Sequence, residues 1–508
     1  MDNKIYFVNK IPPLGFKVED EISYEERKRV SKKLKENFVW DNTYYRAEIF
    51  GDGKISIFDK STKKVHTSPK FFLDREDKGD EYNWSPGENM VTTIGSKAKL
   101  KIVQESPLST TVRVETNIES PMGEVALLYD VSFDNTPLIR YRIKILNRSK
   151  NHRLDMVFSP DMKSEREIIS HMPFEYIRRP EFIDNSRSIP EKFSRIFIGA
   201  REWGKDYEFP MGDFLAFVDE EGSFAVFPKG IKEYEIHGKD LHVILLRSVG
   251  WVSKADIESR TGDAGPFMYT PDAQCIGELN IEFAIYVGEA KPWDKEFRYW
   301  KDVYQNPPII ISKSVTNGDV EEYSLFSQEE LEITGTKIAE DGDGIIIRGF
   351  NPANFYKIIS IPENFEIVNL LEESIGEKGK ELKLKPFEIV TFKLGVSHIT
   401  YKNTYLYSDK KLNSDFTIIN PLFNWNVYSR DKNYRGDEKD LLFLEKTRVN
   451  LKEEIVKLKR ELSLKEGLSY HRTMFEILSR ERTYLEATLS LLLNKEINLP
   501  EGREKGEI

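Results

Sequence analysis

The fold class follows from one stretch of the chain: YRAEIF (45–50), GDG (51–53) and KISIFD (54–59). In both six-residue runs apolar and polar side chains largely alternate, which is typical of a strand with one buried face. The Gly-Asp-Gly segment between them provides the residue types that tight turns need. The stretch therefore predicts a β-hairpin, and it sets the pattern for the rest of the chain.

Short alternating runs recur through the following sequence, and each is bounded by Pro, Gly, Asn or Asp. They cover Lys99–Val103, Thr110–Ile118, Glu124–Phe133, Leu138–Leu146, Phe214–Asp219, Ser223–Pro228, Tyr234–His237, Leu241–Val249 and Leu279–Val287. Many strands separated by turns, without helical patterns between them, favour antiparallel sheets packed face to face. We therefore expect a mainly β chain whose largest unit, residues 38–305, is an antiparallel β-sandwich.

Two smaller regions flank this unit. Four further strand patterns predict a second, small β-sandwich over residues 306–396; they are Gly344–Arg348, Tyr356–Ile361, Glu366–Leu371 and Glu388–Lys393. Ahead of the large sandwich, residues 1–37 combine a proline-interrupted strand with a highly charged stretch, 19–36. Proline restricts the strand to a sheet edge, and the charged stretch is typical of a solvated linker, with a short helix as the alternative.

After a connecting segment, 397–439, the apolar period becomes that of a helix. One set of residues falls near heptad spacing (Leu444, Leu451, Ile455, Leu458 and Leu462), and a second set shares one face (Met474, Ile477, Leu478, Leu485, Leu489 and Leu492). The break KEGLS (465–469) would join two helices into a hairpin over residues 440–498. Because such stripes must be buried, they predict contact with the β body or a homo-oligomer formed through residues 440–498.

Composition excludes several classes of function. The 508 residues carry a net charge of −10, so the chain lacks the excess of Lys and Arg that nucleic-acid binding needs. The N-terminus, MDNKIYFVNK (1–10), has no signal-peptide pattern, and no window is long and apolar enough to span a membrane. Cys275 is the single cysteine, which excludes an intrachain disulfide. We expect a cytoplasmic protein that binds neither nucleic acid nor membrane.

Short motifs in a shared order carry a resemblance to a known family. They are PPLGF (12–16), GDEYNWSP (79–86), LLRSVGW (245–251), RTGDAGP (260–266), TPDAQC (270–275), EDGDG (340–344), NLLEE (369–373) and KPFEIVT (385–391). Over residues 11–394 the sequence thus resembles the C-terminal, β-rich region of glycoside hydrolase family 38, which includes α-mannosidases and mannosylglycerate hydrolases. The resemblance implies a large β-sandwich of the galactose-mutarotase-like type followed by a small one, in agreement with the strand patterns.

The resemblance also implies that the catalytic parts lie elsewhere. In the family, a preceding α/β domain supplies a His-x-Asp pair, further zinc ligands and the Asp nucleophile. The seven histidines of this sequence include no His-x-Asp, and the similar segment His237-Gly238-Lys239-Asp240 has a different spacing and is typical of a hairpin turn. We therefore expect no catalytic residue, metal or cofactor in this chain, and zinc or another divalent metal only in a catalytic partner.

Two loops contain the candidate residues for contact with substrate or with a catalytic partner: Asp80, Glu81, Tyr82, Asn83, Arg260 and Asp263. The resemblance places both loops toward the catalytic domain, where carboxylates and an aromatic ring can bind a sugar and arginine can orient it. The alternatives are structural. The first loop would then be a Gly-Asp turn with Tyr82 and Trp84 packed into the sandwich, and Arg260 would form an internal salt bridge.

Two classes of function stay open at this point. The first is a non-catalytic subunit or half of an α-mannosidase-type enzyme, which acts on carbohydrate with a separate catalytic chain docked on these loops. It predicts an exposed, partly apolar docking surface. The second is a stand-alone carbohydrate-binding or scaffold protein that assembles through its C-terminal helices, and it predicts a polar, closed surface at the same place. A truncated piece of a larger gene is a third alternative.

Overall fold

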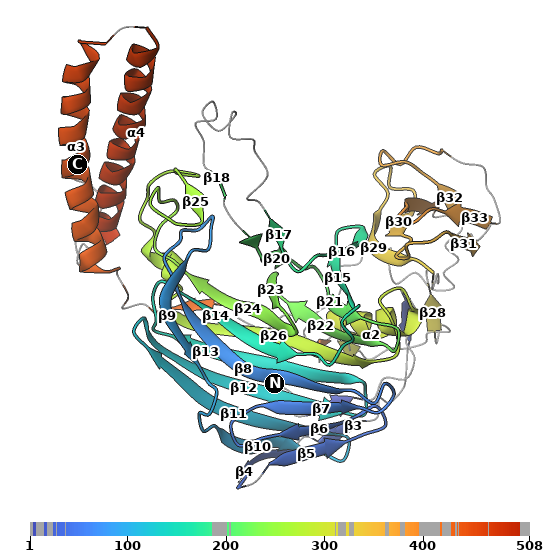
Figure 1. Ribbon diagram of the computed structural model, residues 1–508. Helices are drawn as coiled ribbons and strands as arrows, with labels where there is room; N and C mark the ends of the chain where they lie inside the picture. Colours follow the sequence, from blue (N-terminus) through green and yellow to red (C-terminus); the bar gives the residue numbers. More distant parts are fainter. Residues whose placement is uncertain are drawn as a thin grey trace.

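A computed structural model shows two large antiparallel sheets packed face to face as the main body of the chain (Figure 1). The structure describes residues 4–6, 15–17, 24–26, 28–35, 37–184, 201–202, 205–309, 311–312, 322–324, 330–360, 365–375, 381–395, 417–418, 428–431, 434, 436–465 and 467–497. A small β unit and two C-terminal helices complete it. The predicted fold class, mainly β with a helical hairpin, is confirmed.

The first large sheet has eleven strands. Their spatial order is β16 (Glu175–Arg178), β15 (Glu167–Met172), β21 (Leu215–Val218), β22 (Ser223–Lys229), β26 (Gly277–Gly288), β13 (Leu138–Asn147), β12 (Gly123–Asp134), β11 (Ser109–Ser120), β10 (Lys99–Glu105) and β4 (Lys28–Lys33), and β36 (Tyr428–Arg430) also pairs with β26. Alternate residues of β12 point into the sandwich, from Val125 to Phe133, and are buried. The period of two thus decides which face forms the core.

The second large sheet has nine strands. Their spatial order is β20 (Phe209–Pro210), β23 (Glu233–His237), β24 (Asp240–Ser248), β14 (His152–Ser159), β8 (Val65–Asp77), β7 (Ile55–Asp59), β6 (Tyr45–Ile49) and β5 (Phe38–Asp41), and β9 (Pro86–Thr92) also pairs with β8. The hairpin expected at residues 45–59 is β6–β7, with Ile49 opposite Ile55. Gly53 in its turn has a positive φ of 85°, and its carbonyl accepts a hydrogen bond from the Tyr129 hydroxyl at 2.8 Å.

The small β unit contains a four-stranded sheet and a separate hairpin. The sheet has the order β29 (Glu332–Ile338), β30 (Ile345–Phe350), β34 (Ile389–Leu394) and β32 (Phe365–Ile367), and the hairpin pairs β31 (Lys357–Ser360) with β33 (Glu381–Leu384). Helix α2 (Lys295–Gln305) links this unit to the large sandwich. Its Phe297 packs in the aromatic cluster with Phe214 and Phe227, and its Lys301 pairs with Glu332 at 2.8 Å.

Short pairs and one turn complete the strand inventory. The pairs are β1 (Lys4–Tyr6) with β3 (Tyr24–Glu26), β2 (Gly15–Lys17) with β28 (Glu322–Ser324), β27 (Ile311–Ser312) with β35 (Thr417–Ile418), β17 (Ile183–Asp184) with β19 (Lys205–Asp206), and β18 (Arg201–Glu202) with β25 (Arg260–Thr261); a 3-10 turn spans Pro271–Gln274. Pairing of β2 with β28 brings the N-terminal arm to the region just ahead of the small unit.

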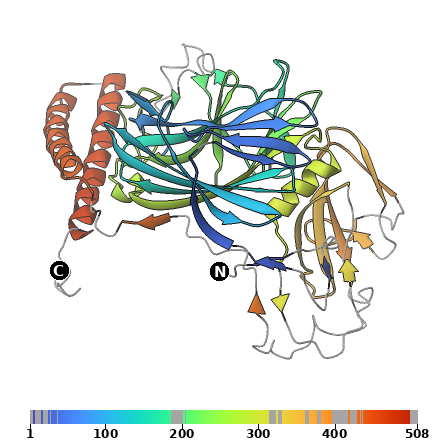
Figure 2. The ribbon, with the colours of Figure 1, turned by 90° about the horizontal axis from the view of Figure 1, so that it is seen from below.

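The helical hairpin consists of α3 (Glu438–Leu462) and α4 (Gly467–Ile497), with the break where the sequence predicts it. Asp437 caps α3 by accepting a hydrogen bond from the backbone N–H of Lys439 at 2.9 Å. The foot of the hairpin packs on the β body through a cluster of Leu444, Ala487 and Leu491 with Trp251 and Tyr269. Figures 1 and 2 show the hairpin and the small unit at opposite ends of the large sandwich.

The predicted apolar face of α4 is largely exposed in the single chain, and its burial against a second copy stays a prediction. Ile477 is buried, but Leu478, Leu485, Leu489 and Leu492 are 49–66% exposed, with Leu485 the most exposed. The buried side of α4 is instead formed by Ile477, Ala487 and Leu491. The helix therefore has apolar residues on two sides. Most of the residues that the sequence pattern grouped together lie on the exposed side.

The charged stretch 19–36 also differs from the expectation. We expected a linker, but Lys28–Lys33 forms β4 and pairs with β10, for example Lys33 opposite Lys101. As the edge strand of its sheet it can expose charged side chains, which also discourage pairing with other chains. Residues 11–14 and most of the connecting segment 397–439 lie outside the described residues. Among the described residues, no helix has an apolar stretch long enough to cross a bilayer.

Candidate functional site

The loop at residues 79–86 is held by a partly buried arginine from the same sheet. Arg247 on β24 donates from Nε to Asp77 Oδ2 at 2.7 Å, and from Nη2 to the carbonyls of Asp80 and Asn83 at 2.5 and 2.6 Å. The turn also needs glycine at position 79, because a Cβ there would lie 2.0 Å from the Asn83 carbonyl oxygen. Burial raises the pKa of Asp77, and Arg247 opposes this shift.

A second arginine joins this loop to the loop that begins at β25. Arg260 donates to both carboxylate oxygens of Asp80, at 2.5 and 3.2 Å, and also to Asn83 Oδ1. Arg260 is 2% exposed and Asp80 is fully buried. Burial raises the pKa of Asp80, but Arg260 and backbone N–H donors outweigh burial and leave the pKa below its ordinary value. This geometry is the internal salt bridge that the sequence left as an alternative.

The other candidate residues have different surroundings. Glu81 is exposed and accepts a hydrogen bond from the Thr270 hydroxyl at 2.7 Å. Tyr82 is 55% exposed, and its ring lies against Gly265, where a Cβ would approach the phenol oxygen to 2.7 Å. Asp263 forms an ion pair with Arg482 on α4. The structure thus brings the two loops together, while their roles toward substrate or partner stay predictions.

Trp84 connects the same loop to a charged cluster that sequence reasoning missed. Its ring makes cation–π contacts with the guanidinium groups of Arg75 and Arg153, which lie 5.0 and 4.8 Å from the ring centroid. Arg153 on β14 is fully buried and pairs with Glu235 on β23 at 2.7 Å and with Glu208. The neighbouring Arg75 on β8 reaches the same Glu235 at 2.9 Å.

This charged cluster contains more carboxylates than cations. Arg75 and Arg153 face Asp155, Glu208 and Glu235. Burial opposes ionisation of Asp155 and Glu235, but the surrounding cations outweigh it and lower the pKa of both carboxyls. Burial raises the pKa of Glu208 to about 7, although Arg153 opposes the shift. Two guanidinium charges are balanced by two carboxylates, so Glu208 is the carboxyl of this cluster that takes up a proton most readily.

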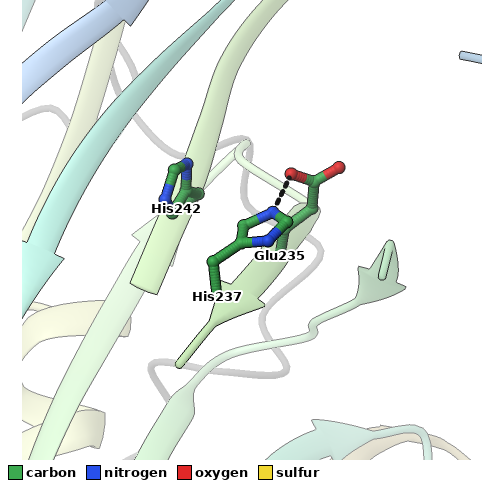
Figure 3. A group of neighbouring side chains, drawn as sticks. All are labelled: Glu235, His237 and His242. Carbon is green, nitrogen blue, oxygen red and sulfur yellow. Dashed lines mark hydrogen bonds and ion pairs between the residues drawn. The ribbon is translucent and has the colours of Figure 1, made fainter. Parts of the chain in front are cut away.

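Three side chains beside this cluster could supply metal ligands: Glu235, His237 and His242 (Figure 3). Their ligand atoms lie within 4.8 Å of one another, and His237 Nε2 is 2.9 Å from Glu235 Oε2. Both oxygens of Glu235 already hold an arginine, and two nearby guanidinium charges oppose a cation. These ligands therefore suit an ionic network better than a metal, and the absence of a metal from this chain stays a prediction.

Little in the sequence indicated the charged cluster. Its members come from three strands, β8, β14 and β23, and from Glu208 just ahead of β20. On β14, Arg153 and Asp155 alternate with the apolar core residues Leu154 and Met156. That alternation is the usual pattern of a solvent-exposed face. Here Arg153 and Asp155 are nevertheless buried, and the Arg153 guanidinium lies over the ring of Trp84.

Comparisons with known proteins give the family. Residues 40–273 match the profile of the glycosyl hydrolases family 38 C-terminal domain, and residues 330–392 match the family 38 C-terminal β-sandwich domain. The first match includes both loops of the candidate site. The chain belongs to glycosyl hydrolase family 38, as its C-terminal region. The helical hairpin of this family 38 region lies beyond both matches.

Relatives of this family 38 region are longer than the chain. A putative mannosylglycerate hydrolase from Halalkalibacterium halodurans is 24% identical over an alignment of 395 residues. The alignment covers 70% of this chain and 41% of that protein. An α-mannosidase structure from Enterococcus faecalis V583 matches 70% of this chain and 42% of that one, with a TM-score of 0.57 and 20% identity. A second family 38 structure from Enterococcus faecalis covers 75% and 46%, with a TM-score of 0.54 and 18% identity. The chain thus spans less than half the length of these relatives.

Proposed function

We propose that this family 38 region is the non-catalytic half of an α-mannosidase-type glycosidase and acts on carbohydrate together with a separate catalytic chain. The observation that carries the proposal is the match to both C-terminal domains of the family, in one chain that spans less than half the length of its relatives. The resemblance to family 38 implies that the metal and the nucleophile belong to the α/β domain that precedes this region in the family. A separate catalytic chain would have to supply both.

The loop surface around Tyr82 is the proposed docking surface. The partly buried Arg247 holds the loop backbone and the buried Arg260 holds Asp80, so the surface is rigid before a partner arrives. Tyr82 and Met90 on the adjoining β9 are 55% and 64% exposed, which gives the surface the apolar side chains that protein interfaces use. A rigid loop with an exposed aromatic ring is also suited to hold a sugar at the edge of a shared cleft.

A scaffold function is the second candidate, and one observation favours it. The exposed leucines of α4 lie outside the segments that match family 38. Such a stripe is suited to assembly and contributes nothing to hydrolysis. In this alternative, the loop surface would bind carbohydrate without any catalytic chain.

The experiment is hydrolysis of an aryl α-mannoside by the purified chain with zinc or cobalt, alone and mixed with a candidate catalytic chain. We expect activity only in the mixture, and Tyr82→Ala should lower it at limiting concentrations of this chain. The matched control is Tyr299→Ala on α2, which removes an equally exposed tyrosine (57%) from another part of the body. Hydrolysis by the chain alone would overturn the non-catalytic assignment. No activity in the mixture, with sugar binding by the chain alone, would favour the scaffold function.

A further inference from the structure

Helix α4 has two apolar seams on different sides. The inner seam contains Ile477, Tyr484, Ala487 and Leu491, and it packs toward α3 and the β body. The outer stripe contains Phe475, Leu478, Leu485, Leu489 and Leu492, which are 48–66% exposed. With about 3.6 residues per turn, the two sets face directions roughly 150° apart around the helix axis.

The outer stripe has the spacing of a coiled-coil seam. From Phe475 the steps alternate between three and four residues through Leu478, Arg482, Leu485, Leu489 and Leu492. A seam of this spacing selects another α-helix as its partner, because each side chain fits between four residues of a facing helix. Arg482 is the single charged member, and its side chain is 55% exposed.

We propose that the outer stripe of α4 binds the same stripe of a second copy of this chain, with the two helices antiparallel. A two-fold axis between Arg482 and Leu485 sets Phe475 opposite Leu492, and Leu478 opposite Leu489, in the second copy. Four of the five apolar members, Phe475, Leu478, Leu489 and Leu492, then face an apolar residue of the second copy, in the self-complementary way that a two-fold symmetric interface requires. The fifth, Leu485, faces Arg482.

The charges decide between antiparallel and parallel pairing. In a parallel pair, Arg482 would face Arg482 of the second copy inside the seam, and two buried like charges oppose each other. In the antiparallel pair, Arg482 faces Leu485 and lies within one turn of Glu486 of the second copy. Glu481 lies beside Thr488 of the second copy, so the seam has no facing pair of like charges.

Dimerisation is tested on the full chain by sedimentation velocity. We expect a dimer at micromolar concentration, and a dissociation constant raised at least about 100-fold by Leu478→Glu with Leu489→Glu, because these two positions face each other and the carboxylates would oppose one another in otherwise apolar layers. The matched control is Leu464→Glu at the hairpin tip, where the leucine is 87% exposed and lies outside the stripe. All substituted positions are exposed, so the circular dichroism spectrum and melting temperature should stay unchanged.

Disulfide formation tests the register. The double variant Leu478→Cys, Leu489→Cys should give a covalent dimer on mild oxidation, whereas Leu478→Cys alone should not. The two positions are about 16 Å apart within one helix, which excludes an internal bond. The unsubstituted chain, whose Cys275 is partly buried, controls for other thiol chemistry.

Three results would overturn the proposal. The unsubstituted chain could stay monomeric even at a concentration 100-fold above the micromolar range, the dimer could persist in the variant with both glutamates, or Leu478→Cys alone could cross-link efficiently. The stripe lies outside the segments that match family 38, so these outcomes are independent of the mannoside assay.

Discussion

At the scale of single residues, the candidate site is organised by buried ion pairs. Asp80 and Arg260, from two separate sequence motifs, form an ion pair in the structure. Their spacing along the chain could not show this, because they lie on loops that follow different strands. The sequence did predict that an internal salt bridge was one of two outcomes for Arg260. It could not predict the charged cluster under Trp84, because buried charges on β14 have the same alternation as exposed ones.

We expect Arg260→Ala to lower the free energy of unfolding by about 3–5 kcal/mol, because it leaves the fully buried Asp80 carboxylate without its cation. Urea unfolding at neutral pH measures the change. Adding Asp80→Ala should recover part of the loss, since the uncompensated charge is removed. If the double variant is no more stable than the single one, the penalty does not come from the unpaired carboxylate.

Glu208 should make stability depend on pH. Its folded pKa, about 7, lies above the ordinary value of 4.5, so the folded chain keeps a proton that the unfolded chain releases between these values. This contribution is fully present below pH 4.5 and is lost as pH rises to about 7, at up to roughly 1.4 kcal/mol per pH unit. Glu208→Gln should therefore gain stability relative to the unsubstituted chain as pH rises. Urea unfolding between pH 5 and 8 tests this, with the exposed Glu220→Gln as control; parallel pH profiles would contradict it.

At the scale of elements, the strands with a simple pattern were predictable and those with charged buried faces were not. The runs from β10 to β13 were predicted within two residues at each end, since one face is apolar and the other is polar. Strands β8 and β14 were missed, because both place charged residues, such as Arg75, Arg153 and Asp155, on a buried face and so lack a purely apolar side. Helix α2 was missed as well: Phe297 and Tyr304 lie on its buried side, but the charged residues Arg298 and Lys301 are buried beside them.

The foot and the tip of the helical hairpin should respond differently to truncation. Leu491→Ala at the inner seam is expected to lower the free energy that holds the hairpin to the body by about 2–4 kcal/mol, because this leucine is 5% exposed within the foot cluster. Leu464→Ala at the tip, where the side chain is 87% exposed, should change it by less than about 0.5 kcal/mol. Hydrogen exchange of α3 and α4 amides measures both. Equal protection in the two variants would show that the foot cluster does not hold the hairpin.

At the scale of the whole molecule, the small β unit is joined to the large sandwich through one buried carboxylate. Glu332 on β29 accepts a hydrogen bond from Lys301 Nζ of α2 at 2.8 Å and from the Tyr176 hydroxyl of β16. His171 Nε2 of β15 lies 3.3 Å from the same side chain. Burial raises the pKa of Glu332, but Lys301 and His171 outweigh burial and leave the pKa well below its ordinary value.

We expect Glu332→Ala to uncouple the two units, because Lys301 is 2% exposed and would lose its buried partner. Calorimetry should then show two transitions where the unsubstituted chain shows a coupled one. The unsubstituted chain should approach the same behaviour in acid: a lowered carboxyl pKa gives stability that is present above the ordinary value of 4.5 and is lost as pH falls below it. A single transition in the variant at neutral pH would show that the aromatic contacts of α2 are sufficient to couple the units.

Trp251 lies where the candidate loop and the hairpin meet. Its ring stacks on Phe267 at 4.9 Å and meets Phe443 of α3 edge-on at 5.8 Å, while its carbonyl accepts a hydrogen bond from the backbone N–H of Glu81 at 3.0 Å. A hairpin that moves away from the body would expose this indole to water and shift its emission to longer wavelengths. Trp251 is one of seven tryptophans, so comparison with Trp251→Phe isolates its emission as a label-free probe of the loops and the helices together.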